Sequence, residues 1–500
     1  MENSIQTLHE LLAQKAAENP ERVFMRFEGK KYTLSNIDLW AEYIAGSLVA
    51  AGFSRSSKAA ILARNCPEFI AAYFGILKAG GIVVPINIML APDEIRYILN
   101  DSEASVCFYG EENRDVAAML RDMGSTEFIP LLKANQMHKH TAPAASASQA
   151  DDVSTILYTS GTTGHPKGAM LTHKNLLSNA VSCTKALDVF PKDRFVVFLP
   201  LSHAFTFTVC VLLPLYVGAS LTLIASVSPF TKVIKRMILD RVNIFVAVPA
   251  VYDILAKRKV PLIVRLLLRL RLSISGASAL SVSTLEIFEK KFRVPLLEGY
   301  GMTEASPVIS VNRLGRSSSK HGTVGLPLLG TEVKVVDDNG AELPEGSAGE
   351  LTVKGPGVMK GYYRRDADTA LTIKDGWLYT GDIAVIDAEG FIKIVDRKKD
   401  LIIVDGLNIY PSEVENALQK HPAVAACAMI GLNDRGRELP VMFVMARKDS
   451  SVNELELKKF LRGKIASFKM PRKFVLVDEL PKTITGKILK RELKKWELPA

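Results

Sequence analysis

The chain has 500 residues, of which 48% are hydrophobic and 23% charged, and its formal net charge is +10. This length exceeds what one compact core accommodates, so the composition predicts a globular protein of two or more domains. The five cysteines form no C-x-x-C pair and the eight histidines show no H-E-x-x-H spacing, which argues against disulfides and structural zinc.

The positive charge is concentrated toward the C-terminus. Residues 396–500 contain 21 Lys and Arg against 14 Asp and Glu, and therefore carry +7 of the +10. A basic segment of this kind can meet nucleic acid, a membrane or a polyphosphate ligand, or it can be a solvated surface. No nucleic-acid-binding motif with interleaved aromatic residues accompanies it, so we expect no nucleic-acid partner.

Residues 1–23 predict an amphipathic helix with charges throughout. A signal peptide would contain an uninterrupted apolar region, and no apolar run of about 20 residues occurs in the chain. We therefore expect a cytoplasmic protein.

Strand-like apolar runs alternate with helical patterns through the first 300 residues. The expected strands are 59–64, 82–88, 105–110, 153–160, 194–200, 220–225, 244–249 and 271–277, and the expected helices include 67–81 and 92–101. This alternation is typical of βαβ units and predicts largely parallel sheets. A low-complexity stretch at 138–152 predicts an exposed loop.

The pattern changes in the last third of the chain. Residues 331–343 contain an Asn-Gly hairpin signal and precede strand-like runs at 349–355 and 390–400, which predicts an antiparallel part. A series of short helices and strands then follows, of a size suited to a small separate domain. We predict an α/β protein: stacked α/β sheets and an antiparallel part over 1–395, and a small α+β domain over 401–500. The boundary lies at 396–400.

The stretch 159-TSGTTGHPKGAMLTH-173 gathers glycines and hydroxyls around Lys167. Glycine lets backbone N–H groups approach an anion closely, so this segment predicts a phosphate-binding loop. It is not a Walker A loop, because Pro166 separates the glycines from Lys167 and no Ser or Thr follows that lysine.

Seven segments in order resemble one family. They are 158–173 (YTSGTTGHPKGAMLTH), 199–203 (LPLSH), 275–281 (SGASALS), 299–304 (GYGMTE), 379–382 (YTGD), 396–415 (DRKKDLIIVDGLNIYPSEVE) and 481–487 (PKTITGK). Together they resemble the adenylate-forming superfamily of acyl-CoA synthetases, luciferases and peptide-synthetase adenylation domains, most of all fatty acyl-CoA ligases. The resemblance implies that ATP, Mg²⁺ and coenzyme A serve to activate a carboxylic acid as an acyl-adenylate. Preorganised cations and donors would stabilise the developing charge.

The resemblance also implies catalytic roles for three residues. Lys487 matches the lysine that bridges the substrate carboxylate and the α-phosphate, and Thr303 matches an α-phosphate contact. Glu304 matches the carboxylate associated with Mg²⁺, a metal that prefers hard oxygen ligands. The plainer alternatives are a solvated tail lysine for Lys487 and a helix-start acid for Glu304.

Nucleotide contacts carry over in the same manner. The residues that would wrap the β- and γ-phosphates are Thr159, Ser160, Gly161, Thr162, Thr163, Gly164 and Lys167. Those that would surround adenosine are Gly276, Ala277, Ser278, Tyr300, Gly301, Asp382 and Arg397, with the Tyr300 ring stacked on adenine. Asp382 would accept hydrogen bonds from the ribose diol, as a carboxylate can, and Arg397 would donate to it.

In many members of this superfamily the small domain rotates before thiol transfer, so the C-terminal domain is expected to be mobile. Lys399 matches the hinge position within 396–400, and Gly406 matches a glycine that lines the pantetheine channel. Three acceptors or reactions remain open: free coenzyme A, a carrier-protein phosphopantetheine, or an oxidative, light-emitting chemistry. No carrier module follows Lys487, which favours free coenzyme A.

The acid itself is less constrained. His203 is expected near its carboxylate, and the apolar segments 204–215 and 244–255 are expected to line an acyl cavity. Such a lining favours alkyl or aromatic acids over acetate, since each buried CH₂ is worth about 0.8 kcal/mol. We expect a medium- or long-chain fatty acid, with an aromatic acid as the alternative. The oligomeric state is not predictable from these patterns.

Residues 260–276 form a basic and very apolar segment in which Arg265 and Arg269 would share a helix face. One hypothesis is a peripheral membrane contact or a guarded access route for fatty acids. The alternative is a core helix with exposed arginines.

Overall fold

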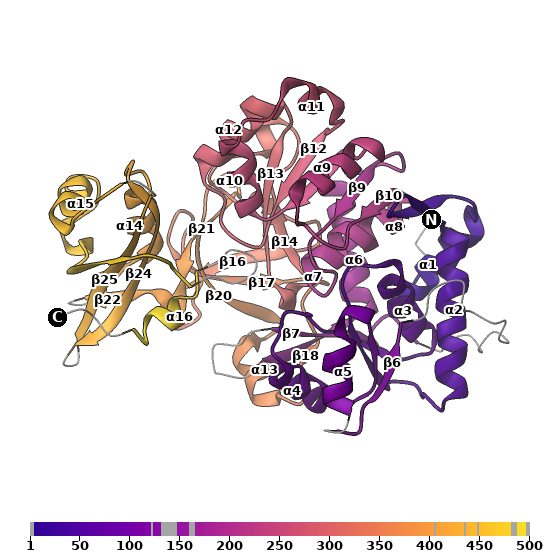
Figure 1. Cartoon of the computed structure of the whole chain (residues 1–500). Coiled ribbons are helices and arrows are strands. Elements are labelled where there is room, and N and C mark those ends of the chain that lie inside the picture. Colours follow the sequence, from indigo (N-terminus) through magenta and orange to yellow (C-terminus); the bar gives the residue numbers. More distant parts are fainter. Residues whose placement is uncertain are drawn as a thin grey trace. The chain divides into compact units, whose positions relative to one another are not determined.

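The computed structural model describes residues 5–121, 124–131, 148–159, 166–404, 407–434, 437–447, 450–481 and 488–496. The chain divides into two compact units (Figure 1). Unit 1 comprises Met1–Glu332 and Val353–Leu378, and unit 2 comprises Val333–Thr352 and Tyr379–Ala500.

Unit 1 contains a nine-stranded sheet with the order β15-β14-β13-β12-β11-β9-β10-β1-β2. Its strands are β1 Val23–Phe27, β2 Lys30–Thr33, β9 Arg194–Val197, β10 Ser220–Leu223, β11 Ile244–Ala247, β12 Leu272–Ser275, β13 Leu296–Gly301, β14 Val308–Val311 and β15 Leu326–Pro327. The strands from β13 through β1 are parallel to their neighbours, and antiparallel pairs close both ends.

A seven-stranded sheet with the order β18-β8-β7-β4-β3-β5-β6 also belongs to unit 1. Its strands are β3 Lys58–Leu62, β4 Ile82–Pro85, β5 Ala104–Tyr109, β6 Glu127–Pro130, β7 Val153–Thr159, β8 Lys167–Thr172 and β18 Gly361–Tyr362. The β7–β8 and β8–β18 pairs are antiparallel and the other pairs of this sheet are parallel, so the prediction of largely parallel sheets is confirmed.

Helices cover both faces of these sheets, which explains why the strands read as continuous apolar runs. The helices of unit 1 are α1 Leu8–Glu18, α2 Leu34–Ala50, α3 Pro67–Lys78, α4 Pro92–Ser102, α5 Arg114–Arg121, α6 His173–Ala186, α7 Ala204–Phe207, α8 Leu213–Val217, α9 Phe230–Leu239, α10 Pro249–Lys257, α11 Leu262–Leu267, α12 Val282–Phe292 and α13 Asp366–Thr372. One core joins α1, α2, α3 and α6 to strands of both sheets. Helices α4 and α5 cover the outer face of the seven-stranded sheet, and α9, α10 and α12 cover that of the nine-stranded sheet.

An antiparallel sheet begins where the sequence pattern changes. It consists of β16 Glu332–Val336, β17 Gly349–Lys354, β20 Trp377–Ile386, β19 Ile373–Lys374 and β21 Ile392–Arg397. The predicted Asn-Gly turn is present: Gly340 has φ 84° and Val336 bridges to Glu342 in antiparallel register. Glycine adopts that left-handed backbone without steric cost.

The C-terminal part of unit 2 is a small α+β assembly. It contains β22 Ile402–Val404, β23 Leu407–Ile409, α14 Pro411–Leu418, β24 Val424–Asp434, β25 Arg437–Ala446, α15 Glu454–Leu461, β26 Lys473–Val477 and α16 Lys490–Leu493. Val414 and Leu418 of α14 share a core with Met429 and Met442 of the β24-β25-β26 sheet. The predicted α/β class with a small α+β domain is therefore confirmed. The assignment of 396–400 as a hinge stays a prediction. Of the loop predicted at 138–152, residues 138–147 lie outside the described residues.

Candidate active site

The predicted phosphate segment connects two strands rather than a strand and a helix. Strand β7 ends at Thr159 and β8 begins at Lys167, and these two residues face each other in antiparallel register. Ser160, Gly161, Thr162, Thr163 and Gly164 lie outside the described residues. The strand expected before this segment is confirmed.

Lys167 forms an ion pair with Asp368 of α13. Its ammonium also lies 5.4 Å from the centroid of the Tyr362 ring, where a cation is attracted to the aromatic face. Asp368 was not anticipated from the sequence, because it lies 201 positions from Lys167 and only folding brings the two together. The strand β18, which pairs with β8, brings α13 to this place.

Glu304 is 7% exposed and lies on a 3₁₀ turn, Thr303–Ala305. Its Oε1 accepts a hydrogen bond of 2.9 Å from the Tyr362 hydroxyl and one of 3.4 Å from the Thr159 hydroxyl. Burial and the neighbouring Glu304 carboxylate raise the pKa of Tyr362, so this phenol keeps its proton and acts as a donor. The structure thus brings together Thr159 and Glu304, and it adds Tyr362.

The chemistry around Glu304 fits Mg²⁺. A buried carboxylate among hydroxyl groups offers hard oxygen ligands, and Mg²⁺ in nucleotide sites takes one or two carboxylates plus phosphate oxygens. Among the described residues, no three His, Cys, Asp or Glu side chains gather as a metal site. Glu304 fits the predicted role of holding the metal together with nucleotide phosphates, and this role stays a prediction.

The two segments predicted to enclose adenine lie side by side at the ends of β12 and β13, which pair in parallel. Gly276, Ala277 and Ser278 follow β12, and Tyr300 and Gly301 end β13. A Cβ on Gly301 would come within 2.1 Å of the Pro307 carbonyl oxygen, so only glycine fits there.

Glu298 ties these two segments together, and the motifs did not identify it. Its Oε1 accepts a 2.8 Å hydrogen bond from the Leu280 N–H, and burial raises the pKa of Glu298 to about 7. The signal in the sequence was an acidic residue inside an apolar strand, directly before the 299–304 motif.

His203 precedes α7 and lies next to a buried apolar stretch. Burial lowers the pKa of His203, so the ring is neutral at neutral pH. Phe205 packs on the backbone of Gly276, where an added Cβ would come within 2.8 Å of the ring. The predicted acyl-pocket segment and the predicted adenine wall are therefore in contact.

Unit 2 brings the two predicted ribose ligands together. Asp382 of β20 and Arg397 of β21 face each other in register, and Arg397 Nε lies 3.0 Å from Asp382 Oδ1. Lys399 lies two residues further on, in the 3₁₀ turn Lys398–Asp400, and burial together with the Arg397 charge lowers its pKa. Lys487 and Gly406 lie outside the described residues.

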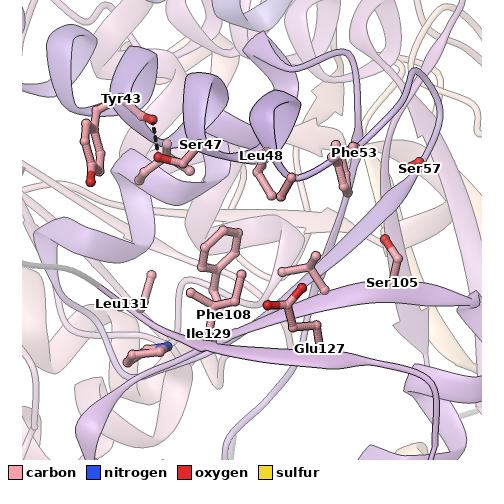
Figure 2. A pocket seen from close by; sticks show the side chains of 15 residues that line it. Tyr43, Ser47, Leu48, Phe53, Ser57, Ser105, Phe108, Glu127, Ile129 and Leu131 are labelled. Carbon is pink, nitrogen blue, oxygen red and sulfur yellow. Dashed lines mark hydrogen bonds between the residues drawn. The ribbon is translucent and has the colours of Figure 1, made fainter. Parts of the chain in front are cut away.

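A cavity of about 260 Å³ lies in unit 1 away from these residues (Figure 2). Leu48 and Phe53, at and after the end of α2, face Phe108 of β5 and Ile129 of β6 across it. None of the predicted site residues that the structure describes lines it, so the described part of the predicted nucleotide and acyl site lies elsewhere.

Comparisons with known proteins agree with this geometry. The profile of the AMP-binding enzyme family matches residues 12–363, and that of the AMP-binding enzyme C-terminal domain matches residues 413–487. A long-chain-fatty-acid–CoA ligase of Bacillus subtilis (strain 168) is 32% identical over 98% of this chain and 94% of its own length. A feruloyl-CoA synthase of Amycolatopsis sp is 34% identical over 96% of this chain and 97% of its own length. The crystal structure of ATP-bound MatB from Rhodopseudomonas palustris superposes with a TM-score of 0.90 at 30% identity, covering 97% of this chain and 98% of that one.

Two α/β sheets and a small α+β assembly in one chain, together with the matches to both family profiles, define an adenylate-forming enzyme. The chain belongs to the AMP-binding enzyme family, and within it to the AMP-forming acyl-CoA ligases.

Proposed function

We propose that this enzyme activates a medium- or long-chain fatty acid with ATP and passes the acyl group to coenzyme A. The observation that carries the proposal is the buried Glu304, held by the Tyr362 and Thr159 hydroxyls beside the phosphate hairpin. A carboxylate fixed there can hold Mg²⁺ against nucleotide phosphates. ATP binding is supported by the ATP-bound relative.

The reaction has two steps. A carboxylate oxygen of the acid attacks the α-phosphorus of ATP, the bond to the β-phosphate oxygen breaks, and pyrophosphate leaves. The sulfur of coenzyme A then attacks the acyl carbon, its proton is lost, and AMP leaves. We assign Lys167 and Thr159 to the leaving phosphates, Thr303 and Lys487 to the α-phosphate, and Glu304 to the metal.

Nucleoside recognition and domain rotation complete the assignment. We assign the ribose to Asp382 and Arg397, and adenine to Tyr300 with the 276–278 backbone, Gly301 allowing the close chain approach. Lys399 is assigned to the hinge and Gly406 to the pantetheine channel. In this scheme 1–395 stays fixed while 401–500 turns between the two steps.

The choice of a fatty acid is supported by the apolar character of the segment after His203. Val209, Val211, Leu212 and Leu215 are all buried there, and the Bacillus subtilis relative is a long-chain-fatty-acid–CoA ligase. An aromatic acid is the second candidate, because the Phe205 ring lies on Gly276 and the Amycolatopsis relative is a feruloyl-CoA synthase.

The test is acid-dependent AMP release with ATP and Mg²⁺, measured with and without coenzyme A. Acetate, octanoate, palmitate, benzoate and ferulate serve as substrates. We expect turnover that requires coenzyme A and favours octanoate or palmitate. A preference for benzoate or ferulate would replace the fatty acid by an aromatic one. A stoichiometric adenylate that coenzyme A cannot discharge would point to a carrier protein.

The variant Lys487→Ala tests whether adenylate formation and transfer to coenzyme A are separate steps with different residue requirements. This variant should lose adenylate formation but retain thioester formation from supplied acyl-adenylate, because the lysine acts on the α-phosphate. Equal loss of both steps in rapid-quench assays would contradict the assigned role.

A further inference from the structure

Helix α11, Leu262–Leu267, lies at the periphery of unit 1 (Figure 1), and its large aliphatic side chains at 262, 263, 266 and 267 are exposed. The exposed fractions are 62% for Leu262, 61% for Ile263, 70% for Leu266 and 49% for Leu267. No residue of this helix is buried. A contiguous group of exposed large aliphatic side chains is unusual on a soluble surface and marks an interaction site.

The helix is held in this orientation by its arginine. Arg265 donates a 2.9 Å hydrogen bond to the carbonyl of Lys291, near the C-terminal end of α12, and Val264 packs against the core below. The prediction that Arg265 and Arg269 share a helix face is wrong, because α11 ends at Leu267. The alternative of a core helix with exposed arginines is also wrong: here the leucines are exposed and Arg265 is anchored.

A basic rim accompanies this apolar helix. Residues 253–293 contain nine Lys and Arg against three Asp and Glu, of which Glu286 is exposed. Lys290 lies in α12 and Arg293 directly follows it. The exposed basic residues, which we call the basic rim, are Lys257, Arg258, Lys259, Arg269, Lys290 and Arg293. Lys291 donates a 2.9 Å hydrogen bond to the Arg258 carbonyl, which fixes the end of α10 beside α12. Apolar side chains within a cationic rim match the acyl boundary and anionic headgroups of a bilayer.

We propose that α11 and its basic rim dock unit 1 on the surface of an anionic lipid bilayer. The leucines enter the headgroup and acyl boundary, and the rim contacts lipid phosphates. None of the described helices is long and apolar enough to cross a membrane. Docking of a second copy by the same face would oppose two basic rims, and nucleic acid would leave the leucines in water. The proposal does not depend on which acid is activated.

The test is co-sedimentation with vesicles of phosphatidylcholine alone and of phosphatidylcholine with phosphatidylglycerol. The parent enzyme should bind only the anionic vesicles. A double variant, Leu262→Gln with Leu266→Gln, should weaken binding by about tenfold or more, and Lys257→Glu with Lys259→Glu should abolish the preference for anionic lipid. AMP release on a water-soluble acid should stay unchanged in both, since these side chains are exposed.

Leu371→Gln is the matched control. Leu371 is 71% exposed in the same unit, but it lies on α13 beside Asp366 and Asp368. The proposal is overturned if the parent does not bind anionic vesicles, or if Leu371→Gln weakens binding as much as the double variant. It is also overturned if the leucine variant instead converts a dimer to a monomer in sedimentation velocity, since α11 would then be a self-association surface.

Discussion

Tyr362 and Glu304 form the central contact among the candidate site residues of unit 1. The phenol donates to a carboxylate that is 7% exposed, so the hydrogen bond is charge-assisted and shielded from water. The hydroxyl of Thr159 reaches the same oxygen. Residues from β7, β18 and the 3₁₀ turn at 303–305 thereby converge on one atom.

Replacing Tyr362 by Phe should remove this donor without changing the ring. A hydrogen bond to a charged group is worth about 1.5 to 3 kcal/mol, so we expect adenylation to fall by roughly ten- to a hundredfold and more Mg²⁺ to be needed. ATP–pyrophosphate exchange at varied Mg²⁺ concentration measures the adenylation rate and the Mg²⁺ requirement. Tyr363→Phe is the control, since its hydroxyl donates to Glu103 instead. An unchanged Mg²⁺ dependence would exclude a role for Tyr362 in orienting Glu304.

Two buried histidines should make unit 1 sensitive to acid. Burial lowers the pKa of His9 to about 4 and that of His173 to about 3, and their rings lie 5.5 Å apart. Between pH about 6.5 and 4 the unfolded chain therefore binds more protons than the folded one, so stability falls as the pH falls. For His9 alone the loss at pH 5 is about 2 kcal/mol.

Urea unfolding at pH 7 and pH 5 checks this expectation. His9→Gln removes one titrating group, so the difference in unfolding free energy between the two pH values should shrink by about 2 kcal/mol. If parent and variant lose the same stability on acidification, His9 does not contribute to the acid sensitivity.

At the level of single residues, the sequence predicted the site residues that stand inside short recognisable motifs. Thr159 and Glu304, and Asp382 and Arg397, are each brought together as pairs. Tyr362 and Asp368 were missed, because an isolated Tyr or Asp carries no signal until a strand pairing places it. Glu298 was missed although an acidic residue inside an apolar strand is a signal.

Among the elements, α16 is held to α14 by an ion pair. Lys490 Nζ lies 2.8 Å from Glu415 Oε1, and both side chains are less than one-fifth exposed. Lys490 follows Lys487 by three residues, so α16 anchors the chain directly after the predicted catalytic lysine.

Lys490→Met should leave the Glu415 carboxylate buried without its partner, which costs about 3 kcal/mol of stability. We expect the urea midpoint of unit 2 to fall and adenylation to weaken, because the anchor after Lys487 is loosened. The double variant Glu415→Leu with Lys490→Met removes both charges and should recover most of the stability. A single variant as stable as the parent would contradict the importance of the pair.

Periodicity predicted the elements of the parallel sheets well, because strands buried on both faces read as continuous apolar runs. It failed at α11, where Arg265 and Arg269 were expected to share one helix face but the helix ends at Leu267. Composition does not say which face a short helix buries, and here the hydrogen bond from Arg265 to Lys291 decides it.

For the whole molecule, the sequence predicted a large and a small part, but it did not predict which segments of the chain make up each compact unit. By compactness, residues 333–352 belong with 379–500, so unit 1 is discontinuous in sequence. Local patterns predicted contiguous domains, since the contacts that join 333–352 to the later strands are long-range.

Lys399→Pro tests the proposed rotation. Proline fixes φ and lacks an N–H, so it should restrict the hinge and slow thioester formation more than adenylate formation. Single-turnover measurement of each step gives the two rates, and Lys399→Ala is the control for loss of the side chain alone. If Lys399→Pro leaves both rates unchanged, the rotation does not depend on this position.

The hairpin setting of the phosphate segment has a consequence for the electric field that a nucleotide meets. A helix N-terminus presents roughly half an elementary positive charge, fixed by aligned peptide dipoles. Dipoles of paired strands largely cancel, so β7 and β8 offer no such fixed field. In the proposed function, Lys167 and the metal add attraction for the outer phosphates through a side chain and an ion that can both be repositioned. Nucleotide affinity in this enzyme should therefore vary with Mg²⁺ and ionic strength more steeply than in a loop that opens a helix.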